Sequence, residues 1–392
     1  MGVATGVLAR FGRSGALPRW IQPGLERFPG VAQILTTRET ATGFLGLDDV
    51  TVPYAERSGL LGLGAFPLAL DGDEHATARE FVEGVLEDTD EQHRRGVAAA
   101  SEVADEQVAA ATGSRLEVVG AVVEPALTTW IEEWYGLAGQ GTNLLRAGRL
   151  IAHATFLNPK VPGGRYDVQG LGRAITLVDD YRPPLAAAMD AAGPHTVARG
   201  LIEATGDPSL AAGHLLGLTV GPLALGTWAV VNVVDALLDQ PWTLDSVTTA
   251  ADGEAAFTAA LRRRPPLQGV LRNNPRPRTL DLPPNGGQSG GQIEVPPGLV
   301  LVHTECAAHL DDADAGAGAP LPPELPFGIG VHACLGQRQI TEVAEVVLRA
   351  LGARSPRRVD GRRGRVQPGP APSGVSAKSW GFPGRLEVDL LR

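Results

Sequence analysis

Hydrophobic residues recur three and four positions apart, the spacing typical of helices, over most of this chain. Runs of this kind follow Asp71 and occupy 88–137, 174–192, 207–238 and 337–351. Short stretches with strand character lie at 31–35, 50–52, 292–302 and 375–391, with a helical piece at 39–45. The pattern predicts a mostly helical α+β protein with small β-sheets.

The most apolar of these runs begins at Asp207-Pro208, an N-cap followed by proline at the first helical position. Residues 215–234 contain no ionisable side chain, which satisfies the length criterion for a membrane span. Gly217, Gly221, Pro222 and Gly226 interrupt the run, and no basic loops flank it. We therefore expect a helix buried in a protein core, kinked at Pro222, and no membrane partner.

The composition narrows the class of protein. The 392 residues are 43% hydrophobic and carry a formal net charge of −10, which argues against binding nucleic acid through bulk positive charge. Two cysteines give no disulfide framework, and the first residues lack a long apolar segment, so we expect a cytoplasmic protein. No Ser/Gly linker divides the chain, which favours a single domain over 1–392.

The stretch that stands out chemically runs from Phe327 to Gly336 and contains Cys334 among glycines. Because a helical run follows directly, the thiol lies at a helix N-terminus, where the helix dipole and backbone N–H groups favour the thiolate. The glycines allow the backbone to pass close to a large flat group. A buried, inert cysteine in a turn is the alternative interpretation.

The spacing F-G-x-G-x-H-x-C-x-G resembles the haem-thiolate loop of the cytochrome P450 family at every fixed position. The resemblance implies that Cys334 is the axial ligand of the iron of haem b (iron protoporphyrin IX). It also places Phe327, His332 and Gly336 at the cofactor, with His332 reaching a haem propionate. An inert cysteine would explain one of these positions but not the others.

Other cofactor contacts are predicted from cationic side chains. His75 and Arg79 are four residues apart and share one helix face, where they suit a pair of carboxylates. The P450 family carries this H-x-x-x-R pair on the helix that binds the propionates. The strand expected at 267–272 matches the family's propionate-binding strand, which makes Arg272 a third candidate. Residues 292–302, with Pro296-Pro297-Gly298, resemble the hairpin that follows this strand in the family, and the basic residues 354–365 are expected to form a loop.

The central helix departs from the family. The family's segment with an acid followed by a threonine falls on residues 221–225, so Ala224 and Leu225 replace the two side chains that deliver protons to dioxygen. Pro222 precedes them, and Thr227 comes two residues late. Since activation of dioxygen needs those protons, an apolar wall predicts poor ordinary monooxygenation unless the substrate or water supplies them.

The helix that normally carries E-x-x-R also departs. Ala259 occupies the glutamate position, whereas Arg262 keeps the arginine, and residues 311–326 contain no arginine that would complete the group. Loss of both partners is coherent, because removing one charge alone would leave the others buried and unpaired. We expect Arg262 to be paired elsewhere or exposed.

Several arginines would gather on the cysteine side of such a fold and suit an acidic ferredoxin-type electron donor. They are Arg262, Arg263, Arg264, Arg276, Arg278 and Arg338. A solvated arginine-rich surface explains them equally well. Two rival motifs are weaker: the G-x-S-x-G at 287–291 lacks the strand before it and the helix after it, and Cys306, His309, Asp311 and Asp312 form a poor zinc set.

The sequence thus favours an atypical member of the P450 family, of the soluble bacterial type. We expect a haem-thiolate oxidoreductase that acts on an apolar small molecule, in a biosynthetic tailoring step, with hydrogen peroxide, substrate-assisted or non-monooxygenase chemistry. The alternative is a catalytically silent P450-like auxiliary protein that stabilises a partner enzyme such as a glycosyltransferase. The retained cofactor residues favour the first, and the missing acid–alcohol pair and Ala259 favour the second.

Overall fold

The computed structural model describes residues 27–28, 32–35, 38–64, 66–111, 115–157, 168–239, 244–267, 269–281, 291–303, 325–373, 375 and 381–391. The chain divides into two compact units. The cysteine unit comprises Met1–Pro53, Lys160–Tyr166 and Leu261–Cys334, and the helical unit comprises Tyr54–Pro159, Asp167–Ala260 and Leu335–Arg392. The expectation of one domain over the whole chain stays a prediction.

The described part of the cysteine unit is built on small sheets. One has the strand order β1 (Arg27–Phe28), β2 (Ala32–Leu35), β7 (Gly298–Val302), β4 (Val270–Asn274), in which β2 and β7 are parallel. Helix α3 (Arg38–Leu45) contributes Phe44 to a core that contains Leu35, Val300 and Val302. The alternation along β6 and β7 sends every second side chain into this core.

The hairpin predicted at 292–302 is wrong. Strand β6 (Gln292–Val295) pairs antiparallel with β5 (Arg278–Asp281), whereas β7 pairs with β2 and β4 on its two sides. Both edges of β7 are therefore occupied. Thr51, within the predicted strand 50–52, forms an isolated bridge to Asn273.

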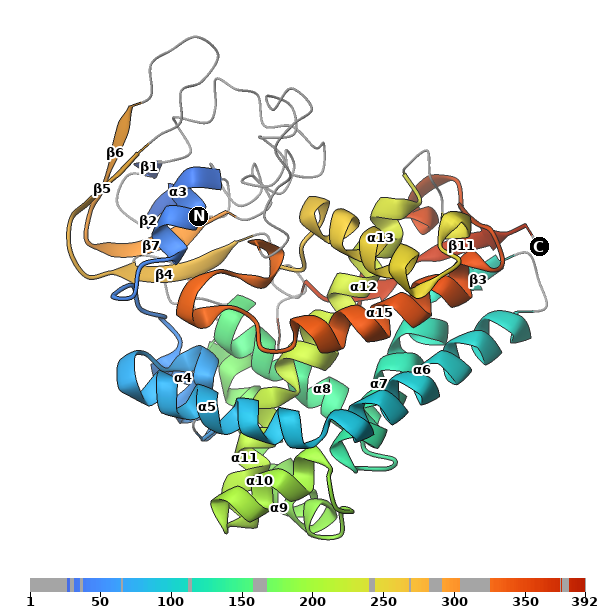
Figure 1. Cartoon of the computed structure of the whole chain (residues 1–392), viewed down its shortest axis with the longest axis horizontal. Helices are drawn as coiled ribbons and strands as arrows, with labels where there is room; N and C mark the ends of the chain where they lie inside the picture. The colour runs from blue at the N-terminus through green and yellow to red at the C-terminus, as the bar shows by residue number, and fades with distance from the viewer. Residues whose placement is uncertain are drawn as a thin grey trace. The chain divides into compact units, whose positions relative to one another are not determined.

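The helical unit holds most of the helices (Figure 1). Their bounds are α4 (Ala55–Leu60), α5 (Gly72–Asp88), α6 (Asp90–Ala110), α7 (Glu124–Tyr135), α8 (Gly141–Ala152), α9 (Val168–Asp190), α10 (Val197–Thr205), α11 (Pro208–Leu218), α12 (Gly226–Leu237) and α15 (Gln337–Gly352). Helix α13 (Ala250–Arg263) crosses the boundary of the units, and π-helical turns η3 (Val119–Val123) and η4 (His153–Leu157) adjoin α7 and α8. The predicted α+β class is confirmed.

A buried polar cluster joins α6, α7 and α15. The ring nitrogens of His93 bond to Trp130 Nε1 at 3.1 Å and to Glu342 Oε2 at 2.8 Å. Trp130 stacks on Trp134, whose Nε1 donates to Thr89 Oγ1 at 2.9 Å. Because Trp130 Nε1 can only donate, His93 Nδ1 accepts and Nε2 carries the proton toward Glu342. The cluster fixes the first half of α15 to α6.

The basic stretch near residue 358 was expected to be a loop, but it forms β8 (Pro356–Arg358). This strand pairs with β11 (Glu387–Leu390), which also pairs with β3 (Arg115–Glu117). Arg358 forms ion pairs with Asp235 at 2.7 Å and Asp239 at 2.8 Å, at the end of the central helix. Strands β9 (Gln367–Pro368) and β10 (Pro383–Arg385) form a separate pair.

Within the described residues, one helical run, Pro208–Leu237, is long and apolar enough to cross a membrane, with a mean hydropathy of 1.5. Its most apolar window is 67% buried inside the structure, as in a core helix of a soluble protein. Asp207 caps the run by accepting from Ser209 N and Leu210 N, as predicted. Residues 287–290 of the G-x-S-x-G motif lie outside the described residues. So do residues 304–324, which include Cys306, His309, Asp311 and Asp312.

Candidate haem-thiolate site

The cysteine loop, residues 327–336, is closed by its own backbone. Cys334 N donates to Phe327 O at 2.8 Å, and Ala333 N donates to Gly330 O at 3.0 Å across the short helix Gly330–His332. Gly330 has φ +75, and a Cβ there would lie 2.6 Å from Leu45 O. Ile329 packs against the sheet core of the same unit. Glycine is thus required for this loop to seat on α3.

The thiol of Cys334 is exposed in the structure. Gly336 is the N-cap residue of α15, and a Cβ added to it would meet no described atom within 4 Å. The loop therefore presents a thiol at the N-terminal end of a long helix, with an open backbone beside it. His332 is half-buried in the same loop.

Arg272 lies on β4, in the cysteine unit, and is 7% exposed. Its Nη1 donates to the carbonyl of Leu271 at 2.9 Å. The predicted cofactor residues Phe327, His332, Cys334 and Arg272 therefore belong to one unit, whereas His75, Arg79 and Gly336 belong to the helical unit, as do positions 222, 224 and 225.

His75 and Arg79 lie on α5 as predicted. His75 is buried, and its pKa is lowered because burial disfavours the imidazolium and the neighbouring Arg79 adds to that effect. Arg79 Nε bonds to Glu83 Oε1 at 2.9 Å one turn along the helix. This arrangement presents a neutral imidazole and a partly exposed guanidinium.

The predicted kink at Pro222 is a π-helical segment, η5 (Val220–Leu225), between α11 and α12. Proline has no N–H to bond the carbonyl four residues earlier, which is that of Leu218. Tyr135 Oη donates to this carbonyl at 3.2 Å from the end of α7. Burial raises the pKa of Tyr135, so the phenol stays a donor. The sequence analysis missed this residue, although a proline inside a helix signals that the freed carbonyl needs another donor.

The acid and alcohol positions of the central helix, 224 and 225, hold apolar side chains that pack inside the structure. Ala224 is fully buried and Leu225 is half-buried. Thr227, two residues later, is fully buried, and its hydroxyl has no hydrogen-bond partner among the described residues. On α13, Ala259 and Arg262 are half-buried, and Arg262 Nε likewise has no described partner.

Comparisons with solved structures match nearly the whole chain. A mutant of P450 EryK in complex with erythromycin B shares 19% identity over 99% of this chain and 96% of its own, with a TM-score of 0.70. HmtN, a post-tailoring hydroxylase involved in himastatin biosynthesis, shares 17% identity over 97% and 96%, with a TM-score of 0.67. The chain has the cytochrome P450 fold.

A curated relative supports the same assignment. The C-19 steroid 1alpha-hydroxylase of Sorangium cellulosum is 32% identical over 143 residues, which span 36% of this chain and 36% of that protein. No family model matches the chain. The predicted resemblance to the soluble bacterial P450 proteins is confirmed, and it is a resemblance of fold across the chain with closer sequence similarity in about a third of it.

The residues of this chain fit a haem group. The exposed Cys334 thiol offers the single soft ligand that the P450 fold uses. Among the described residues no group of three or more His, Cys, Asp or Glu side chains could hold a metal ion by themselves. The haem cofactor and its individual contacts remain predictions for this chain, which shares the fold of these P450 structures.

The predicted arginine face is partly neutralised. Arg276 bonds to Asp49 at 3.0 Å, and Arg278 pairs with the same carboxylate. Arg338 pairs with Asp90 and, at 3.3 Å, with Glu342. The Arg278 contact lowers the pKa of Asp49, and the Arg338 contact lowers that of Asp90. These arginines are committed to carboxylates within their own units.

Proposed function

We propose that this chain is a haem-thiolate oxidoreductase that acts on an apolar small molecule in a biosynthetic tailoring step, with hydrogen peroxide as its preferred oxidant. One observation carries the proposal: an intact cysteine loop with an exposed thiol occurs in the same chain as a central helix whose chemical positions are apolar. The reducing cytoplasm suits a protein with two cysteines.

Each predicted residue has a role toward haem b. Cys334 would supply the thiolate ligand, and Phe327, His332 and Gly336 belong to the loop that holds it. His75, Arg79 and Arg272 bind the propionates through charge-assisted and neutral hydrogen bonds. When bound, the haem supplies oxidative chemistry that amino-acid side chains cannot perform.

The oxidant follows from the proton supply. Reduction of dioxygen consumes protons as well as electrons, and a positioned acid and alcohol would deliver them. Pro222, Ala224 and Leu225 have no proton to transfer, and Thr227 is a buried alcohol outside that segment. Hydrogen peroxide already carries the two electrons and two protons that the dioxygen route must import, so it needs no electron donor and no proton from outside the site. A substrate hydroxyl that replaces the relay is the second route to the same product.

The substrate class is supported by two relatives. The Sorangium cellulosum relative is a steroid hydroxylase, and HmtN hydroxylates in a biosynthetic pathway. Residues 215–234 supply a buried wall without ionisable side chains, which suits an apolar substrate rather than a charged one.

A second candidate function is an auxiliary protein that stabilises a partner enzyme. Arg262 favours it, because its half-buried guanidinium lacks the glutamate expected at Ala259. The exposed Cys334 thiol opposes it, since a helper without haem has no use for such a loop. If activation of a partner enzyme persisted in Cys334→Ala, the auxiliary function would replace our proposal.

The deciding experiment compares oxidants. The haem-loaded protein is given steroids and other apolar metabolites with either hydrogen peroxide or a ferredoxin, its reductase and dioxygen. We expect peroxide to give at least about tenfold more product, because only the dioxygen route has to import protons past the apolar positions 222–225. Faster, tightly coupled turnover with the electron donor would overturn the peroxide assignment, and absence of product with either oxidant on all substrates would favour the auxiliary function.

A further inference from the structure

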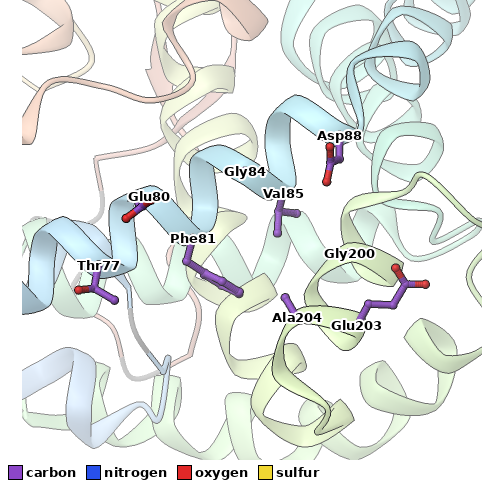
Figure 2. A pocket seen from close by; sticks show the side chains of 9 residues that line it. All are labelled: Thr77, Glu80, Phe81, Gly84, Val85, Asp88, Gly200, Glu203 and Ala204. Atoms are coloured by element: carbon purple, nitrogen blue, oxygen red, sulfur yellow. The ribbon is translucent and has the colours of Figure 1, made fainter.

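A groove of about 580 Å³ lies between α5 and α10, within the helical unit (Figure 2). We call it the α5–α10 groove. It is lined by Thr77, Glu80, Phe81, Gly84, Val85, Asp88, Gly200, Glu203 and Ala204. Thr77, Gly84 and Asp88 lie on the face of α5 opposite to Arg79, so the groove is separate from the predicted cofactor contacts.

The floor of the groove is apolar. Figure 2 shows Phe81 and Val85 directed from α5 toward α10, with Ala204 facing them. Gly200 allows α10 to approach closely, because a Cβ there would lie 3.2 Å from Val85. Gly84 is different, since a Cβ there meets no described atom within 4 Å. The floor therefore has space for an apolar side chain from outside.

The rim is acidic and lacks cations. Glu80, Asp88 and Glu203 are exposed, and no residue that lines the groove is basic. In the part of the chain that the structure describes, none of these three carboxylates forms an ion pair, whereas Arg276, Arg278 and Arg338 each do. The carboxylates of the groove rim, unlike these arginines, are therefore available to pair with a partner.

We propose that the α5–α10 groove docks a basic amphipathic segment of a partner protein, with an apolar side chain on Phe81 and Val85 and lysines or arginines beside the three carboxylates. The charge complementarity selects this occupant, because an acidic or neutral segment would leave the rim unpaired. Such a partner differs in charge from the acidic electron donor expected from the sequence. The proposal does not depend on the oxidant assigned above.

The test uses the purified full-length protein and a short fluorescent Lys/Leu peptide with helical period, followed by fluorescence anisotropy. The triple variant Glu80→Gln, Asp88→Asn, Glu203→Gln should weaken binding by about tenfold, the sum of three exposed charge pairs. The matched control is Glu102→Gln, Asp105→Asn, Glu106→Gln, which removes three exposed carboxylates from α6 that form no ion pair among the described residues, with the same change in net charge. We expect the control to change the dissociation constant less than twofold, at about the scale of screened long-range charge.

A steric variant separates the groove from general attraction between opposite charges. Gly84→Leu places its Cβ in open space and suits a helix better than glycine, so the protein should fold normally and lose the peptide. Equal weakening by the groove and control triples, or unchanged binding to Gly84→Leu, would overturn the proposal. Equal affinity for a Glu/Leu peptide of the same pattern would do so as well.

Discussion

The cysteine loop and the central helix differ in how they follow the P450 pattern. The loop, 327–336, matches every fixed position, and glycine is required at 328 and 330 by positive φ angles and at 330 also by the approach to Leu45. The central helix, Pro208–Leu237, contains the π-helical segment η5 but has alanine and leucine at the acid and alcohol positions. The loop thus has the family's residues at its fixed positions. The helix has no proton-donating side chain at position 224 or 225.

This difference indicates that the π-helical shape of the central helix does not depend on an acid at position 224 or an alcohol at position 225. Pro222 removes the N–H that would close the turn, and Tyr135 supplies a donor to the freed carbonyl of Leu218. The side chains of Ala224 and Leu225 contribute to this helix only by packing.

The largest effect is expected from a variant that restores the acid and alcohol in the central helix. The double variant Ala224→Glu, Leu225→Thr restores the acid and alcohol and should raise dioxygen-driven turnover by at least about tenfold, at the low end of what positioned proton donors contribute. Turnover is measured with ferredoxin, reductase and dioxygen.

Peroxide-driven turnover of the same variant is the control, and it should change far less. A double variant that retains its haem and gains no dioxygen-driven activity would refute the proton-supply explanation.

A smaller effect is expected from Tyr135. Tyr135→Phe leaves the Leu218 carbonyl without its donor and should lower the free energy of unfolding by about 1–3 kcal/mol. In a Pro222→Ala background the restored N–H can serve that carbonyl, so the same change should cost less. Urea denaturation measures both differences.

Tyr181→Phe is the matched control, because Tyr181 bonds a side chain, Gln140 Oε1, at 2.9 Å rather than an orphaned carbonyl. Equal costs of Tyr135→Phe in the two backgrounds would show that the phenol does not compensate for the proline.

The smallest effect concerns the helix that follows the cysteine loop. Burial lowers the pKa of His93 below its ordinary value of 6.5, and the hydrogen bond that His93 donates to Glu342 opposes this only in part. Arg338 lowers the pKa further and Asp90 raises it. The unfolded chain therefore binds a proton at pH values where folded His93 is still neutral, so the free energy of unfolding should fall as the pH drops below about 6.5 toward the lower folded pKa.

Denaturation midpoints between pH 7.5 and 5 on the histidine scale test this expectation. His93→Gln should be less stable at neutral pH and should show a flatter pH dependence, while His75 continues to titrate in both proteins. An unchanged slope in His93→Gln would assign the pH dependence to other groups.

The sequence predicted what local chemistry determines. The cysteine loop, the H-x-x-x-R helix and the Asp207-Pro208 start depend on residues within a few positions of one another. The hairpin at 292–302 was wrong because strand pairing is decided by the partners of β7, which come from β2 and β4.

Long-range pairs were also beyond reach. Asp49 pairs with Arg276 and Arg278 across more than two hundred residues, and Asp90 with Arg338 across a similar span, so the predicted docking arginines could not be recognised as paired. The donor at Tyr135 was missed for the same reason, although Pro222 required some donor at Leu218.

The central claim is that Cys334 holds a haem iron through its thiolate. The most direct test is the absorption spectrum of the purified protein, first ferric and then reduced under carbon monoxide, for the natural chain and for Cys334→Ala. We predict a thiolate-type haem band that is lost in Cys334→Ala. A protein that contains no haem after expression with ample haem supply, or a band that persists unchanged in Cys334→Ala, would contradict the account.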